Sequence, residues 1–291
     1  MLAKTLELVT EARRHGVAIG AFNTYSLELT QAILGAAEQL KQPVILQLGV
    51  ASVKNGREPL VKATVLAAQN AGVPVAVHLD HCANIGMIEQ CLAWGCSSAL
   101  ADGSHLSFEE NILLTRQAAA LASSYGATIE AELGYLAGTE DGVTIEAVRA
   151  SLTDPEQART FVEATGASML AVAIGNVHGF TPNPPPLDFE LLSRIASQVD
   201  VPLILHGASG LGKESIQRAI SLGVAKINVN TEVRTAFLTA IAAWGQRVGP
   251  TPDVRQRGQD WLDLMREATA AAQAVVTEHM QTVAMMPSSS P

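Results

Sequence analysis

The chain has 291 residues, of which 48% are apolar and 16% are charged, as expected of a globular protein with a substantial buried core. Nineteen basic residues against 28 acidic ones give a formal net charge of −9, and only 4% of the residues are aromatic. These values argue against a nucleic-acid-binding surface and against an anionic-membrane surface, since both need clustered positive charge.

The sequence contains no recognisable targeting or membrane segment. The first residues, MLAKTLELVTEARRHG, mix both charges and lack the apolar stretch of a signal peptide. Apolar runs such as ASMLAVAIG end well short of the ~18 residues that a membrane helix needs. The cysteines at 82, 91 and 96 form no CxxC motif, which favours a reducing compartment over a disulfide framework. We therefore expect a cytoplasmic protein without membrane or nucleic-acid partners.

Short apolar runs typical of strands alternate with helical patterns along the chain. The candidate strands lie at 17–23, 43–49, 74–80, 97–103, 127–133, 168–175, 202–207 and 225–230. Each is followed by a segment of helical periodicity, so the sequence predicts an α/β fold, a (β/α)8 TIM barrel. An open doubly wound sheet is the alternative. Its dinucleotide-binding form loses support because no GxGxxG follows the first strand.

Two connections are unusual. Residues 134–153, after the fifth strand, are rich in glycine and acidic residues, and connections this long are usually functional lids or disordered insertions. Residues 176–187, NVHGFTPNPPPL, contain four prolines that hold the backbone extended.

The C-terminal region continues beyond the eight strand–helix units. Segments 231–248 and 261–283 predict two long helices, and MMPSSSP predicts a frayed tail. We assign 1–249 to the barrel catalytic domain and 250–291 to a C-terminal helical arm and tail.

Polar residues suited to chemistry collect at the carboxyl ends of the predicted strands, where TIM-barrel active sites lie. They are Asp80, His81, Asp102, Glu132, His178, His206, Asn228 and Asn230. Neutral imidazole nitrogens suit a metal ion such as Zn²⁺, and a catalytic zinc site keeps three protein ligands and an open position. One histidine at a strand end is more often structural, but three histidines with three carboxylates favour a metal site.

The remaining histidines have other expected places. His15 and His279 lie on helices outside the predicted rim and are expected in solvent. His105 follows a strand end by a few residues and is a weaker site candidate. His78 lies two residues deeper than Asp80 with the same parity, so it should point into the barrel and support the site from below.

A phosphate-binding pattern lies beside the metal pattern. HGASGLGKES (206–215) joins a strand to a helix through small residues, and offers backbone N–H groups and Ser209 at a helix N-terminus. NVNT (228–231) leads from the eighth strand into the next helix. In TIM barrels, the loops after strands seven and eight are a frequent phosphate site.

Six motifs resemble those of the class II fructose-bisphosphate and tagatose-bisphosphate aldolases. In chain order they are HLDH (78–81), ADGSH (101–105), EAELG (130–134), GNVHG (175–179), LHGASG (205–210) and KINVNTE (226–232). The resemblance implies a zinc-dependent aldolase on a TIM barrel, although another divalent ion could serve and a monovalent cation could accompany it. The implied reaction is reversible cleavage of a ketose phosphate, such as fructose or tagatose 1,6-bisphosphate, to dihydroxyacetone phosphate (DHAP) and an aldehyde. A homodimer or homotetramer is also implied.

The resemblance assigns metal and proton-transfer roles by position. His81, His178 and His206 match the zinc ligands. Asp102 and Glu132 match carboxylates that hold an alternative metal position or orient the ligands. Asp80 matches the acid–base group of the aldehyde half, and Glu140 matches the mobile glutamate that moves the DHAP proton. Asn228 matches a residue close to the enediolate.

The resemblance also assigns substrate contacts. Those to DHAP and its phosphate match Gly179, Gly207, Ala208, Ser209, Asn228, Val229, Asn230 and Thr231. Arg255, in the segment PDVR, matches an arginine that reaches the second phosphate from a neighbouring subunit.

Four departures from the family pattern concern the aldehyde half of the substrate. After GNVHG the chain reads FTPNPPP, with no lysine before Lys213. Cys82 follows the first histidine ligand, PDVR replaces DPR, and the substrate-discriminating position 230 is Asn. We expect a weaker preference for bisphosphates than the family pattern gives, with Arg255 carrying most of what remains. The proline run either narrows the aldehyde pocket or only fixes a surface loop.

Three other functions fit parts of the pattern. A zinc hydrolase would use the same histidines to activate water. A Schiff-base aldolase would use Lys226 as nucleophile, although its deeper position favours a buried partner such as Glu130. A sugar-phosphate sensor would need neither Asp80 nor Glu140. An assay of DHAP release against hydrolysis distinguishes the hydrolase from the aldolase. Borohydride trapping with DHAP detects the Schiff base, and DHAP binding without turnover favours the sensor.

Overall fold

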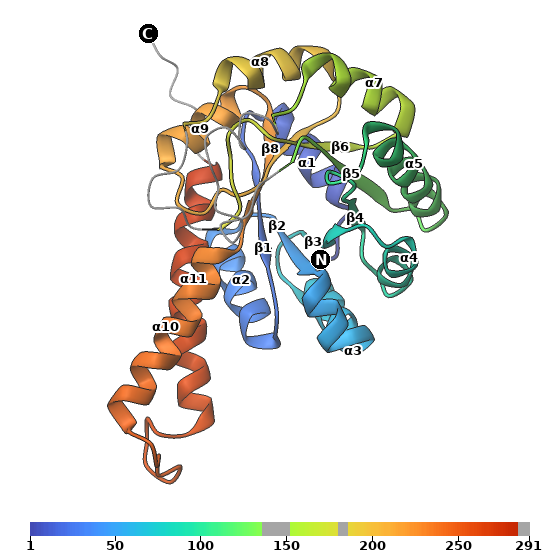
Figure 1. Cartoon of the computed structure of the whole chain (residues 1–291). Coiled ribbons are helices and arrows are strands. Elements are labelled where there is room, and N and C mark those ends of the chain that lie inside the picture. Colours follow the sequence, from blue (N-terminus) through green and yellow to red (C-terminus); the bar gives the residue numbers. More distant parts are fainter. Residues whose placement is uncertain (136–151, 180–185, 285–291) are drawn as a thin grey trace.

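The computed structural model describes residues 1–135, 152–179 and 186–284. Within these ranges eight parallel strands form a closed barrel in sequence order (Figure 1). They are β1 (Ile19–Asn23), β2 (Val44–Gly49), β3 (Val75–Cys82), β4 (Ser98–Ala101), β5 (Thr128–Leu133), β6 (Met169–Val172), β7 (Leu203–Leu205) and β8 (Val224–Val229). The predicted TIM barrel is confirmed, and the open sheet is excluded.

Helices cover the outside of the barrel (Figure 1). They are α2 (Leu27–Leu40), α3 (Val50–Asn70), α4 (Ile85–Ala93), α5 (Phe108–Ser124), α7 (Pro155–Thr165), α8 (Phe189–Gln198), α9 (Lys213–Ser221), α10 (Thr231–Val248) and α11 (Trp261–Ala284). Several begin at a residue whose side chain accepts a hydrogen bond from the first turn, as Ser107 does for α5 and Asp188 for α8. No helix in the described ranges has the length and apolarity needed to cross a bilayer.

The barrel interior changes from apolar to polar along the strands. Its amino-terminal end is closed by α1 (Thr5–Arg14). The apolar layer there consists of Val9, Ala12, Ile19, Ala21, Ile45, Ala76, Met169, Ala171, Ile204 and Ala225. On β3 the next inward positions are His78 and Asp80, whereas Val77 and Leu79 belong to the core shared with the outer helices. This alternation directs the polar side chains of several strands to one end of the barrel.

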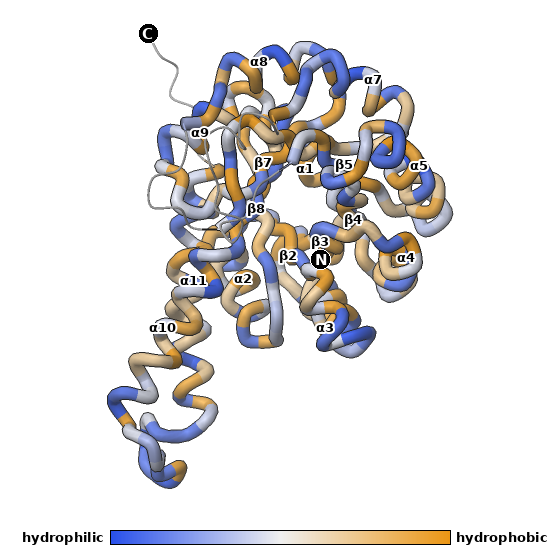
Figure 2. Tube along the Cα trace, viewed as in Figure 1, coloured by the Kyte–Doolittle hydropathy of each residue, from blue (hydrophilic) through white to orange (hydrophobic). Residues whose placement is uncertain are grey.

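The last two helices form an antiparallel pair that projects from the barrel (Figure 1). The carboxyl half of α11 returns to the barrel and packs against α2, α9 and β1. It buries Ala272, Val276, Met280 and Val283 in the main core. The projecting end leaves apolar residues in solvent, including Leu238, Trp261 and Leu262, and Figure 2 shows apolar positions along both helices. One helix therefore belongs both to the ring around the barrel and to the projecting arm.

Two matched substitutions on α11 test this dual role. Val276→Asp should lower the free energy of unfolding by roughly 3–5 kcal/mol, because it places an unpaired carboxylate in the core. Leu262→Asp, on the same helix where the side chain is 60% exposed, should leave stability unchanged. Urea unfolding followed by circular dichroism measures both. Equal midpoints for the two variants would contradict the packing of α11 as part of the barrel.

Candidate functional site

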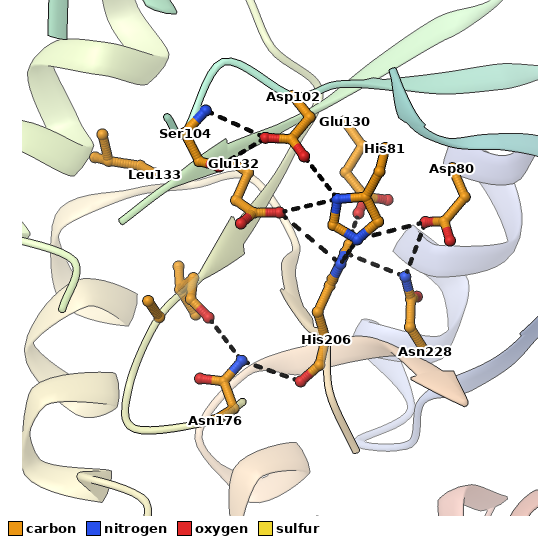
Figure 3. A network of polar contacts seen from close by, with 12 residues as sticks. Asp80, His81, Asp102, Ser104, Glu130, Glu132, Leu133, Asn176, His206 and Asn228 are labelled. Carbon is orange, nitrogen blue, oxygen red and sulfur yellow. Dashed lines mark hydrogen bonds and ion pairs between the residues drawn. The ribbon is translucent and has the colours of Figure 1, made fainter. Parts of the chain in front are cut away.

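The carboxyl ends of β3, β4, β5, β7 and β8 bring the predicted polar residues into one cluster. Figure 3 shows Asp80, His81, Glu132, His206 and Asn228 directed toward one another from these strands. Their side chains are buried or nearly so, except for His81, whose side chain is 27% exposed. Of these five side chains, His81 is therefore the most exposed.

Three histidines from distant parts of the chain surround one point. The His81 ring centroid lies 4.9 Å from that of His178 and 4.8 Å from that of His206, and the latter two centroids are 6.2 Å apart. One ring nitrogen of each histidine lies within 4.8 Å of the others. Three imidazoles arranged in this way can hold a single metal ion and leave one side open.

The backbone conformation of His81 directs its ring into the site. His81 has φ +46°, the left-handed region that non-glycine residues rarely adopt, at a register shift of β3 against β4. Its Nδ1 lies 2.7 Å from Asp102 Oδ2, which orients Nε2 toward His206 Nδ1 at 3.0 Å. Burial alone lowers the pKa of His81, but the surrounding carboxylates outweigh it and raise the pKa to about 10. A raised pKa favours the doubly protonated ring, in which Nε2 donates to His206 Nδ1.

A buried carboxylate orients His206 from below. Glu130 Oε1 lies 2.7 Å from His206 Nε2, so His206 donates at Nε2 and its Nδ1 lone pair faces the cluster. Lys226 Nζ donates to Glu130 Oε2 and to Asn228 Oδ1, both at 2.8 Å. Burial raises the pKa of Glu130, but Lys226 and the histidines more than offset this effect and lower it well below its usual range. One ammonium group thus fixes both the histidine ring and the Asn228 amide.

Close contact between two loops places His206 beside His178. Gly207 has φ +62°, and a Cβ at this position would collide with the carbonyl oxygen of Val177. Asn176 links the same segments, since its amide donates to the His206 carbonyl at 3.0 Å. Only glycine allows the chain after β7 to pass this close to the segment that carries His178.

Asp80 is held by three amide side chains. Asn23 and Gln47 donate to its two carboxylate oxygens at 2.8 and 2.9 Å, and Asn228 donates at 3.4 Å. Burial raises the pKa of Asp80, but His81, His206 and Lys226 together lower it below its usual value. Asp80 is therefore an oriented, ionised carboxylate beside the histidine cluster, suited to accept a proton.

Glu132 and the neutral imidazoles fit a divalent cation. Glu132 Oε2 is buried without a hydrogen-bond partner, and burial together with neighbouring carboxylates raises the pKa of Glu132 to about 8. Burial lowers the pKa of His178 to about 3 and also lowers that of His206, so both rings are neutral donors. His81, Asp102 and Glu132 form a second group with ligand atoms within 4.8 Å. An unpaired buried oxygen beside neutral nitrogens is a donor set for a metal ion.

Comparisons with known proteins agree with this geometry. Residues 3–286 match the sequence family described as "Fructose-bisphosphate aldolase class-II". The chain is 44% identical over 264 aligned positions to a fructose-bisphosphate aldolase of Thermus caldophilus, covering 83% of this chain and 87% of that protein. The chain belongs to the class II fructose-bisphosphate aldolase family. It is therefore a lyase.

Two solved structures resemble this class II aldolase closely. The YdjI aldolase from Escherichia coli K12 superposes with a TM-score of 0.84 at 36% identity, covering 98% of both chains. A putative fructose-1,6-bisphosphate aldolase from Coccidioides immitis superposes with a TM-score of 0.85 at 37% identity, covering 96% of both chains.

The predicted phosphate contacts of the aldolase lie in loops beside the histidines. Gly179 and Gly207 have positive φ values, +87° and +62°, after the sixth and seventh strands. The side chains of Ala208 and Val229 are buried, so these residues can offer only backbone groups. Ser209 is half-buried in the β7–α9 loop, Thr231 begins α10, and Asn230 Oδ1 accepts a hydrogen bond from Tyr25 at 2.9 Å. These loops adjoin His206 and Asn228 directly.

One predicted residue is not brought to this cluster, and another falls outside the described ranges. Arg255 lies in the loop that joins α10 to α11 at the far end of the projecting pair, where it is 87% exposed and pairs with Asp253 at 2.8 Å (Figure 1). Glu140 lies outside the described residues.

The remaining histidines differ in part from expectation. His78 points inward as predicted, with Nδ1 2.7 Å from Ser98 Oγ, and burial lowers its pKa to about 3. His15 is exposed and pairs with Glu11, and His105 is exposed. The prediction that His279 lies in solvent was wrong. Its side chain is 13% exposed and lies 2.6 Å from Glu232 Oε2, because α11 packs back on the start of α10.

Two supporting residues were missed by the sequence analysis, and the predicted partner of Lys226 has a second role. Asn23 and Gln47 hold Asp80, and Glu130 orients His206 in addition to pairing with Lys226. All three lie at inward positions near the carboxyl ends of their strands. The strand-end criterion that selected Asp80 would have found Asn23 at the end of the first predicted strand, and Gln47 if it had reached two residues deeper into the second.

Removing Lys226 should loosen the site that it supports. Lys226→Met leaves the buried Glu130 carboxylate without its ammonium partner, so we expect a loss of roughly 3–5 kcal/mol in unfolding free energy. Metal affinity should fall roughly 10- to 100-fold because His206 loses its oriented hydrogen-bond partner. The double variant Glu130→Gln/Lys226→Met should recover stability but not metal affinity. Chelator competition and urea unfolding measure the two effects; wild-type metal affinity in Lys226→Met would refute this role.

Metal binding should release protons. A divalent ion bound by His81 Nε2 must displace its proton, and the raised pKa of His81 means that the proton is present at neutral pH. Affinity should therefore rise with pH, about tenfold per unit below the His81 pKa. Calorimetry in buffers of different ionisation enthalpy should give at least one proton released at pH 7. Release of none would contradict the protonated His81.

Proposed function

We propose that this class II aldolase is a zinc-dependent ketose-bisphosphate aldolase that reversibly cleaves a ketose phosphate to DHAP and an aldehyde. The observation that carries the proposal is the cluster of three histidines around one point, with Asp80 ionised and oriented beside it. Such a set binds one metal ion on one side of the substrate and moves a proton on the other. Fructose and tagatose 1,6-bisphosphates are the first substrates to test.

The residues divide the chemistry between the two halves of the substrate. His81, His178 and His206 would hold the ion, which when bound supplies a Lewis acid for the negative charge that carbon–carbon cleavage leaves on DHAP. Asn228, fixed by Lys226, directs its amide toward the same region. Asp80 exchanges a proton with the hydroxyl or carbonyl oxygen of the aldehyde half. The Gly207–Ser209 loop and the start of α10 receive the DHAP phosphate through backbone N–H groups.

Two rival functions lose support from the surroundings of Lys226 and Asp80. Lys226 is fully buried and paired with Glu130, which does not suit a Schiff-base nucleophile. A sensor would have no use for an ionised carboxylate that three amides hold against the cluster. A hydrolase shares the metal site, and the assay separates it from an aldolase. Zinc-loaded enzyme should release DHAP from ketose phosphates, should hydrolyse neither lactones nor phosphoesters, and should not be trapped by borohydride.

Two variants separate the proton-transfer steps. Asp80→Ala should abolish cleavage and leave the exchange of DHAP protons with solvent measurable, because Asp80 serves the aldehyde half. Glu140→Ala should slow that exchange roughly 10²–10⁴-fold, as expected for the loss of a general acid–base group. Deuterium exchange followed by NMR measures both. Loss of exchange in Asp80→Ala, or unchanged exchange in Glu140→Ala, would reverse these assignments.

Arg255 would act on the second phosphate from a neighbouring copy. It lies at the far end of the projecting helix pair, remote from its own site, so a homodimer or homotetramer is proposed in which the arm reaches another barrel. We expect a modest preference for fructose 1,6-bisphosphate over fructose 1-phosphate in kcat/KM, and a further loss in Arg255→Ala. A preference of several orders of magnitude that survives this substitution would show that other groups hold the phosphate.

A further inference from the structure

The helix that follows the eighth strand, α10, begins without a side-chain cap. Asn230 precedes its first turn, but the Asn230 side chain accepts no hydrogen bond from that turn, and its Oδ1 accepts from the Tyr25 hydroxyl at 2.9 Å instead. Among the described residues, the backbone N–H groups of 231–233 have no acceptor. These groups lie at the positive end of the α10 dipole, so they are suited to receive an anion.

The acidic residue of this first turn, Glu232, is held by a different helix. Its Oε2 lies 2.6 Å from Nε2 of His279, on α11, which runs beside α10 (Figure 1). The Glu232 side chain is 31% exposed and that of His279 is 13% exposed. The hydrogen bond with His279 lowers the pKa of Glu232, burial opposes this effect, and the backbone N–H of Gly210 adds to it. Glu232 is therefore an ionised carboxylate in the first turn of α10 that contacts α11 rather than its own helix.

Packing alone does not account for a histidine at this position. The carboxyl half of α11 is held to the barrel by apolar side chains, among them Val276, Met280 and Val283. Among the described residues, the side-chain hydrogen bond of His279 is the one with Glu232. A donor mounted on a helix that packs firmly against the barrel is suited to hold a neighbouring carboxylate in one place.

A hollow beside the pair gives Glu232 room to move. It lies between α9, α10 and α11, has a volume of about 570 Å³, and is lined by Thr231, Glu232 and His279 among others. A Glu232 carboxylate without its histidine partner can therefore turn toward the N–H groups of 231–233, which stabilise negative charge. Lys213 lines the same hollow, but it is exposed, so water weakens its attraction for the carboxylate.

We propose that His279 is a positioning residue for phosphate recognition, and that by holding Glu232 aside it keeps the start of α10 open to the phosphate of DHAP. This inference rests on the proposed function, which places that phosphate at the same helix end. His279 itself does not touch the substrate. Loss of its imidazole N–H should let the Glu232 carboxylate compete with the phosphate for the first turn of α10.

A binding experiment tests this role without turnover. Zinc-loaded protein is titrated calorimetrically with glycerol 3-phosphate, and with glycerol as the probe that lacks the anion. The affinity for glycerol 3-phosphate should fall roughly three- to tenfold in His279→Leu, which removes the donor and keeps an apolar side chain. His279→Gln retains a donor and should lose less. The double variant His279→Leu/Glu232→Ala should regain most of the wild-type affinity, because the released carboxylate is gone.

The double variant separates positioning from a merely structural role. If His279 served only to pack α11 against α10, removal of Glu232 as well would not restore the affinity. Glu278→Ala is the matched control, since it removes a carboxylate from the neighbouring position in the lining of the same hollow, and it should bind as the wild type does. A double variant no tighter than His279→Leu would overturn the proposal. Wild-type affinity in His279→Leu, or no binding of glycerol 3-phosphate by the wild type, would overturn it too.

A kinetic experiment distinguishes failure of this inference from failure of the proposed function. In the condensation of DHAP with D-glyceraldehyde, His279→Leu should raise the KM for DHAP by the factor seen in binding. It should leave kcat and the KM for D-glyceraldehyde nearly unchanged, because Asp80 and the three clustered histidines are not altered. A lower kcat with an unchanged KM for DHAP would contradict the positioning role. Absence of aldolase activity in the wild type would instead refute the proposed function, and the glycerol 3-phosphate titration would still judge His279.

Discussion

The site depends on the contacts that the buried carboxylate of Glu130 makes with Lys226 and His206. This carboxylate lies one layer below the histidine cluster, where water cannot stabilise its charge, and it is stable there only because an ammonium and an imidazole N–H contact its two oxygens. The same pair determines which nitrogen of His206 faces the other histidines and which way the Asn228 amide points. The buried ion pair of Glu130 and Lys226 therefore orients both His206 and Asn228 inside the barrel.

The gradient from apolar to polar along the barrel interior explains how such charges can be buried in a stable protein. α1 and the small and aliphatic side chains at the amino-terminal end exclude water and provide the packing that folding requires. The charged layers lie toward the carboxyl end, where each inward carboxylate has amide, imidazole or ammonium neighbours. Among the described residues, Glu132 Oε2 is the buried carboxylate oxygen without a hydrogen bond, and it lies 3.6 Å from His81 Nδ1 and 3.9 Å from His206 Nδ1 in the candidate metal site.

Much of this arrangement could be predicted from the sequence. Local patterns located all eight strands and the helix at 231–248, and strand-end position selected the histidines and Asp80. What could not be predicted depends on contacts across the barrel. The pairing of Lys226 with Glu130 was predicted and is confirmed, but the contact of Glu130 with His206 depends on how β5 and β7 face each other across the barrel interior. The contact of His279 with Glu232 requires the return path of α11. The kink of α3 at Arg57 likewise opposes the helical propensity around it.

The packing of α11 has a consequence for synthesis of the chain. β1 and α2 are made long before α11, the helix that covers them. Until β8 and α11 have been made, the apolar face of α2 and the edge of β1 that binds β8 are both unprotected. The barrel therefore closes late, when β8 pairs with β1. Before that, the nascent chain exposes apolar surface that is prone to aggregation.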